Sequence, residues 1–198
     1  MKNGKKLVEL PQELFMTLAL YIEQDQPSSV RMDRVLETYN MLARRKISLA
    51  TPILLNLRKP EGNLSSCFIT AMDDNLNSIY YVLDQCARIS QNGGGVGINV
   101  SRVRSLGASI RGVPEASGGV IPWIKLIDNT TVAVNQLGKR PGAMTVALDI
   151  WHRDIEDFLE LQTENGDLNM KALKIHPQIV IPDEFMRRLE NGQDWKLS

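Results

Sequence analysis

The stretch QNGGGVGINV, residues 91–100, decides how the middle of the chain folds, because it joins a predicted helix to a predicted strand. Residues 75–91 have the amphipathic pattern of a helix, and the three glycines that follow end it. Residues 96–100 are strand-like, and residues 65–72 form a short apolar run typical of a buried strand. A strand, a helix and a second strand in this order favour an α/β architecture with largely parallel strands.

The same alternation continues on both sides of this stretch. Toward the C-terminus the pattern predicts a long helix over 117–137, a strand over 144–150, a helix over 154–162, a strand over 175–181, a helix from Pro182, and a strand beginning at 195–197. Toward the N-terminus it predicts a helix opening at Leu10-Pro11, where proline suits a first turn, and a second helix over 32–45.

The bulk composition excludes several classes of protein. Lys plus Arg and Asp plus Glu both total 23, so the formal net charge is zero and any phosphate recognition must be local. This balance argues against a nucleic-acid-coating protein. No apolar run approaches the roughly 18 residues that span a bilayer. Two cysteines and no secretory leader favour a reducing cytoplasm, and with two scattered histidines they form no recognisable zinc site.

Five short motifs stand in a distinctive order. They are Ala50-Thr51-Pro52, LSSCF at 64–68, DDNL at 73–76, Arg102-Val103-Arg104, and NQLGKRPGA at 135–143. In this order and spacing, together with the glycines of 93–97, the set resembles the large, catalytic subunit of ribonucleotide reductase, from about Leu10 to the end. The resemblance implies the first part of that family's ten-stranded α/β barrel at 49–198, incomplete in this chain, after a helical segment at 1–48.

The resemblance also assigns a substrate site. Cys67 matches the cysteine that reduces the 2′-carbon of the ribonucleotide and pairs oxidatively with a second cysteine later in the barrel. Thr51 and Ser66 match residues that bind the substrate phosphates, and Gly95 matches a glycine that lets the backbone approach the nucleotide. From the residues alone, Cys67 reads as a small buried residue and the glycine run as a helix end with a tight turn. The run is neither a Walker loop nor a dinucleotide fingerprint.

A second matched site holds the specificity effector, a deoxynucleoside triphosphate or ATP at a dimer interface. Asp74, Asn75 and Leu76 match the segment that holds its sugar and base, and Arg104 and Arg111 flank the loop over its phosphates. The helix at 120–134 matches the one that pairs with its counterpart in a second large subunit. Without the resemblance, these charges read as solvated loop residues.

Residues 135–143 resemble the loop that carries information from the effector base to the substrate base. Gln136 and Arg140 are the side chains expected to reach the bases, and the alternative is a helix end followed by a basic turn. His152 resembles a structural turn of the family and is not expected to act as a base. Cys86 matches no functional position and is expected in the core.

The rest of the family's chemistry has no counterpart in this sequence. The resemblance calls for a radical cysteine, a second redox cysteine and, in many members, a C-terminal cysteine pair, so the isolated chain is expected to be inactive. About 50 residues before Thr51 are too few for the family's ATP-cone. The expected partners are the missing C-terminal half of the subunit and, in the oxygen-dependent group favoured by residues 161–167, a radical-generating small subunit. The chain itself is expected to bind no cofactor; the radical comes from a small-subunit metal cofactor or from adenosylcobalamin, with an external dithiol as reductant.

Three forms of the protein remain open. It is a split or truncated reductase subunit, a non-catalytic nucleotide-binding regulatory relative, or a fragment of one full-length gene. An adjacent reading frame that carries an Asn-x-Cys-x-Glu segment would separate the reductase forms from the regulatory one.

Overall fold

The computed structural model describes residues 2–3, 6–7, 9–134 and 143–198, and these divide into two compact units, Met1–Ser66 and Cys67–Ser198. The sequence predicted a division after residue 48, just before the Thr51 motif. The helix that begins at Thr51 belongs to the first unit by its contacts, so the division of the structure falls later in the chain.

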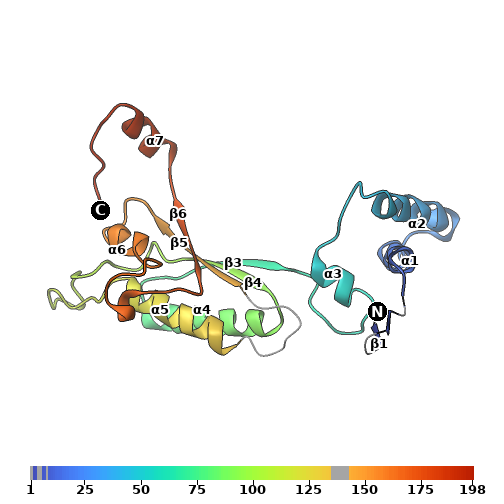
Figure 1. The fold of residues 1–198 in the computed structure, drawn as a ribbon, viewed down its shortest axis with the longest axis horizontal. Coiled ribbons are helices and arrows are strands. Elements are labelled where there is room, and N and C mark those ends of the chain that lie inside the picture. Colours follow the sequence, from blue (N-terminus) through green and yellow to red (C-terminus); the bar gives the residue numbers. More distant parts are fainter. Residues whose placement is uncertain (1, 4–5, 8, 135–142) are drawn as a thin grey trace. The chain divides into compact units, whose positions relative to one another are not determined.

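The first unit is mainly helical (Figure 1). It contains a two-stranded antiparallel ladder of β1 (Lys2–Asn3) and β2 (Lys6–Leu7), and the helices α1 (Pro11–Ile22), α2 (Ser28–Ala43) and α3 (Thr51–Asn56). Helix α1 starts with proline in its first turn, as predicted, and the Glu13 carboxylate accepts a hydrogen bond from the Leu10 N–H at 2.7 Å. Helix α2 begins before the predicted residue 32, and α3 was not predicted.

The second unit is built on one parallel sheet. Its strands lie in the order β3 (Cys67–Ala71), β4 (Gly95–Asn99), β5 (Ala143–Asp149) and β6 (His176–Val180), which confirms the predicted α/β class. The helices are α4 (Leu76–Gln91), α5 (Ile121–Ala133), α6 (Ile155–Leu159), the 3₁₀ turn η1 (Leu168–Met170) and α7 (Asp183–Glu190). Helices α4 and α5 pack against each other and against β4 and β5 (Figure 1).

The core lies between these two helices and one face of the sheet. The strands contribute Val96, Ile98, Met144, Val146 and Leu148, all nearly inaccessible to solvent. Helices α4 and α5 contribute Ile79, Val82, Cys86, Ile121, Ile124 and Ile127. Side chains alternate between the faces of a strand, so the residues between these positions belong to the opposite face of the sheet.

The prediction that residues 65–72 form a buried strand is wrong about burial. The strand exists as β3, but it is the edge of the described sheet, and Cys67, Ile69 and Ala71 are exposed, Ile69 by 92%. Phe68 and Thr70, which alternate with them, are partly buried. An apolar run in sequence does not reveal whether both faces of its strand are covered.

Other boundaries differ for local reasons. Helix α5 starts at Ile121 rather than 117, because Gly119 has a left-handed φ of +73° that interrupts a helix; the predicted end at 137 lies outside the described residues. Helix α6 ends at Leu159 rather than 162. Residues 195–197 form no strand: the Trp195 ring packs edge-on against Phe185, with centroids 5.1 Å apart. None of the helices in the described part of the chain is long and apolar enough to cross a membrane.

Core packing on β5 gives the first testable prediction. Leu148→Ala should lower the free energy of unfolding by about 2–5 kcal/mol, because Leu148 is fully buried and its truncation leaves a cavity. Leu173→Ala, at a side chain that is 54% exposed, should change it by less than about 0.5 kcal/mol. Urea denaturation of both variants measures the difference, and equal losses would contradict the assigned core.

Candidate functional site

The predicted redox cysteine lies at the N-terminal end of the sheet, beside the predicted glycine. In the parallel register Cys67 is the partner of Gly95, and Gly95 is the partner of Ala143. Adjacent strands lie about 4.8 Å apart, so the strands bring Cys67 and Gly95 side by side although 28 positions separate them. Cys67 is exposed, as a reacting thiol must be.

Cys86 has the opposite environment. It lies on α4 within the core and is fully buried. Burial raises the pKa of the Cys86 thiol to about 12, so this group stays protonated and unreactive at neutral pH. The expectation that Cys86 belongs to the core is confirmed.

The two residues predicted to bind substrate phosphates belong to the first unit. Thr51 is the first residue of α3, and Ser66 is the last residue of the unit, directly before Cys67. Cys67 is therefore next to Gly95 in the sheet and next to Ser66 in the sequence. The roles of Thr51 and Ser66 stay predictions.

The five residues predicted to hold the effector line one pocket, which we call the loop pocket. It has a volume of about 490 Å³, within the range of small-molecule sites. Its walls come from the turn after β3, from the start of α4, from the loop between β4 and α5, and from the start of α5. The lining residues are Asp74, Asn75, Leu76, Ile79, Val103, Arg104, Ile110, Arg111, Ser117, Gly118 and Trp123.

Asp74 and Arg104 bind each other across this pocket. The Arg104 Nε donates to an Asp74 oxygen at 2.7 Å, and the Arg104 backbone N–H donates to the other oxygen at 3.2 Å. The Arg104 Nη1 also donates to the Ser109 carbonyl at 2.8 Å. The sequence predicted separate roles for the two side chains, whereas in the structure they form a pair that ties the loop to the end of β3.

Arg111 lies at the tip of a tight hairpin. Ile110 and Val113 exchange backbone hydrogen bonds at 3.0 and 2.9 Å, and Arg111 and Gly112 between them have φ of +50° and +81°. Two positive φ values are the signature of a type I′ turn. A left-handed arginine is uncommon, and the turn holds Arg111 exposed, with no hydrogen bond or ion pair to any described residue.

The rest of the loop pocket is ordered by α4 and by aromatic rings. The Asn75 side chain caps α4 by accepting from the Ser78 N–H at 2.9 Å, which leaves Leu76 exposed at the first turn. Trp123 of α5 meets Tyr80 of α4 edge-on, with centroids 6.4 Å apart. Sequence reasoning missed Trp123 and Ile110, because their place in the wall depends on how the loop folds back.

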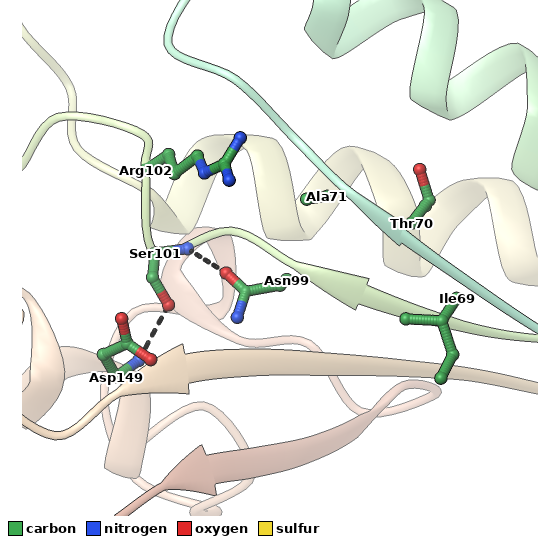
Figure 2. Close-up of a pocket in the computed structure, with 7 residues that line it drawn as sticks. All are labelled: Ile69, Thr70, Ala71, Asn99, Ser101, Arg102 and Asp149. Atoms are coloured by element: carbon green, nitrogen blue, oxygen red, sulfur yellow. Dashed lines mark hydrogen bonds between the residues drawn. The ribbon is translucent and has the colours of Figure 1, made fainter. Parts of the chain in front are cut away.

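A second pocket lies at the C-terminal ends of β3, β4 and β5 (Figure 2). The Asn99 side chain accepts from the Ser101 N–H, and the Ser101 hydroxyl accepts from the Asp149 N–H, both at 2.9 Å. Arg102 at its rim forms an ion pair with Asp73 at 2.8 Å. These bonds fix the start of the β4–α5 loop against the end of β5. The described residues contain no group of three His, Cys, Asp or Glu side chains able to hold a metal ion.

Gln136 and Arg140, predicted to reach the bases, lie outside the described residues. Helix α5 ends at Ala133 before this segment, and β5 begins at Ala143 after it. Their roles stay predictions.

Comparisons with known proteins agree with this geometry. Residues 65–198 match the family model "Ribonucleotide reductase, barrel domain", and residues 1–62 match "Ribonucleotide reductase, all-alpha domain". The ribonucleoside-diphosphate reductase subunit alpha of Synechocystis is 56% identical over 96% of this chain and 25% of its own length. That of Treponema pallidum is 43% identical over 96% and 23%. Large chain 2 of the Saccharomyces cerevisiae enzyme is 40% identical over 98% and 22%.

The chain thus spans about a quarter of the length of these relatives, and the matched part includes both the Cys67–Gly95 pair and the loop pocket. A barrel-domain match over most of the chain, the predicted α/β architecture with a parallel sheet, and high identity to several large subunits lead to one conclusion: the chain belongs to the ribonucleotide reductase family.

Proposed function

We propose that this chain supplies a redox cysteine, part of the substrate phosphate site and the specificity effector site of a ribonucleoside-diphosphate reductase. The observation that carries the proposal is the convergence of Asp74, Asn75, Leu76, Arg104 and Arg111 on one pocket, in the same compact unit as Cys67 and Gly95. The remaining catalytic groups belong to the part of the subunit that the relatives have beyond this match.

In the proposed reaction, Cys67 supplies one of two thiols that reduce the 2′-carbon of a ribonucleotide. The two sulfurs give up two electrons and become a disulfide, the 2′-hydroxyl leaves as water, and an external dithiol reduces the disulfide again. The second thiol lies outside this chain. Thr51 and Ser66 bind the substrate phosphates, and Gly95 leaves room for the nucleotide beside Cys67. The radical that starts the reaction comes from a small-subunit metal cofactor or from adenosylcobalamin.

The loop pocket is the proposed site for a deoxynucleoside triphosphate or ATP. The Arg111 guanidinium is exposed at the hairpin tip and presents its donors to a phosphate group. Arg104 uses two of its five N–H groups on Asp74 and Ser109, so it retains donors for a ligand while it holds the loop in place. Nonpolar walls from Ile79, Ile110 and Trp123 suit the base or the sugar.

We further propose that α5 and the start of α4 form a dimer interface beside this pocket. Leu76, Tyr80 and Tyr81 on α4 are 60%, 55% and 64% exposed, and Val132 on α5 is 59% exposed. Exposed apolar side chains grouped on two packed helices are typical of an interaction surface. Gln136 and Arg140, in the segment that follows α5, then carry the effector signal toward the substrate.

A second candidate is a non-catalytic regulatory relative that only binds nucleotides. It is favoured by the gathering of all five predicted effector residues on one pocket, since nucleotide binding there requires no catalytic group. The presence or absence of turnover in an assembly with the rest of the large subunit separates the two functions.

The redox role is tested by Cys67→Ser in the complete assembly. We expect turnover with an external dithiol to fall at least about a thousandfold, since a hydroxyl cannot form the disulfide, while nucleotide binding is retained. Cys86→Ala is the matched control and should keep its turnover. Alanine is the better replacement there, because a serine hydroxyl would be buried without a partner in the core. Repeated turnover by Cys67→Ser would rule out the assignment.

The effector role is tested by Arg111→Asn. Asparagine tolerates the positive φ of the turn, so the change removes the charge and keeps the hairpin. A charge-assisted hydrogen bond contributes about 1.5–3 kcal/mol, so we expect the Kd of the effector to rise at least about tenfold by calorimetry. Arg102→Asn removes the same charge from the same loop outside the pocket and should change the Kd by less than about threefold. Equal affinities of Arg111→Asn and wild type would place the effector elsewhere.

A further inference from the structure

We propose that Asp154 is a positioning residue for the loop pocket: its carboxylate holds both ends of the 106–120 loop, which carries Arg111. The inference rests on the proposed role of the loop pocket as a nucleotide site and adds a residue outside the pocket that determines its affinity.

The Asp154 carboxylate is bound to the two ends of this loop. It accepts from the Leu106 N–H at 2.9 and 3.2 Å, one distance for each oxygen, and from the Val120 N–H at 2.9 Å. Asp154 itself is only 4% exposed. Hydrogen bonds from backbone N–H groups to a buried carboxylate are charge-assisted and strong.

The position of Asp154 in its own element makes this use distinctive. Asp154 is the N-cap residue of α6, where an aspartate commonly accepts from the first turn of its helix, but its side chain makes no bond to α6. Both carboxylate oxygens instead accept hydrogen bonds from a loop that lies 34 to 48 residues earlier in the chain. The side chain stabilises the loop rather than the helix that it starts.

Gly119 is the residue that permits this approach. It has φ of +73°, and a Cβ placed there would lie 2.4 Å from the Asp154 Oδ2 and 2.9 Å from the Leu106 nitrogen. Both distances are far inside van der Waals contact. A side chain at position 119 and the Asp154 carboxylate therefore cannot occupy the site together.

His152 completes the arrangement. Its Nε2 donates to the Val103 carbonyl at 2.8 Å, and its Nδ1 accepts from the Asp154 N–H at 3.1 Å. Since a carbonyl only accepts and a backbone N–H only donates, these contacts assign the donor role to Nε2 and the acceptor role to Nδ1. Both ring nitrogens are occupied, and His152 fixes the backbone of Asp154 to Val103, a residue of the pocket wall.

The 106–120 loop is a hairpin, so contacts that hold its two ends together also determine its shape. Leu106 and Gly118 form an antiparallel bridge, and the Gly107 N–H donates to the Ser117 carbonyl at 3.0 Å. Ser117 and Gly118 line the loop pocket next to the point where Asp154 holds Val120. Without the Asp154 carboxylate, the two ends of the loop separate more often. The affinity for a ligand then falls in proportion to the fraction of molecules in which the loop has its binding conformation.

The test is Asp154→Ala in the assembly that combines this chain with the rest of the large subunit. ATP and each of the four common deoxynucleoside triphosphates are titrated separately. We expect the effector concentration for half-maximal response to rise at least about tenfold. A rise of this size corresponds to a loop that has its binding conformation in about a tenth of the molecules. At saturating effector, turnover and the choice of substrate base should return to wild-type values, which a general loss of folding would not allow.

Asp128→Ala is the matched control. Asp128 is also a buried aspartate, 5% exposed, and its carboxylate accepts from the Lys174 and Ile175 N–H groups at 2.6 and 3.1 Å, away from the 106–120 loop. The Asp128→Ala variant should lose thermal stability, as Asp154→Ala does, but its half-maximal effector concentration should stay unchanged. Asp154→Asn keeps one acceptor oxygen at lower charge, and we expect a rise of about threefold. This milder variant also serves if the alanine variant does not fold.

The outcomes separate the two proposals. If wild type responds to nucleotides and Asp154→Ala and Asp154→Asn respond at the same concentrations, the positioning role is wrong and the nucleotide site stands. If Asp154→Ala and Asp128→Ala weaken the response equally, the effect is one of general stability, and the positioning role is again overturned. If wild type turns over but binds neither ATP nor any of the four deoxynucleoside triphosphates, the proposed effector site fails and this inference fails with it.

Discussion

The parallel register of the four-stranded sheet is the constraint on which the rest of the second unit depends. It aligns Cys67, Gly95 and Ala143 at one end of the sheet, and it aligns the ends of β3, β4 and β5 at the other. The register is specified by burial: a slip of one residue on β4 would move Val96 and Ile98 out of the core and bring glycine and asparagine into it. The core therefore maintains the geometry of both candidate sites.

The two sites are separated by the length of a strand. From Cys67 to Ala71 is four residue steps, or about 13 Å at 3.3 Å per residue, and the loop pocket begins beyond that point at Asp74. A bound effector in the proposed site would not touch the thiol. Helix α5 has Trp123 in the pocket wall near its start, and it ends at Ala133, immediately before the segment that contains Gln136 and Arg140. In the proposed function, α5 is the element that connects the effector pocket to this segment.

Much of the fold could be predicted because its signals are local. Helix α4 has a polar cap at Asn75 and glycines after Gln91, and its observed bounds agree with the prediction. The residues proposed to hold the effector could be selected from their motifs, and they do line one pocket, but their contacts could not be predicted. The Asp74–Arg104 pair and the Asp154 contacts join positions 30 to 48 residues apart, and no local pattern encodes which backbone N–H a carboxylate will meet. The exposure of Ile69 was missed for the same reason, since coverage of a strand is a property of its neighbours in space.

The loop pocket is built from residues 74–123, and the contact that holds its hairpin comes from Asp154, so every part of it lies in one continuous stretch of the chain. Proteins are synthesised from the N-terminus, and units made of contacts near in sequence fold early. All residues that line the loop pocket or hold its hairpin have therefore been synthesised once residue 154 has been added. Under the proposed function, a nascent subunit would carry every residue of its effector pocket before the rest of its barrel has been translated.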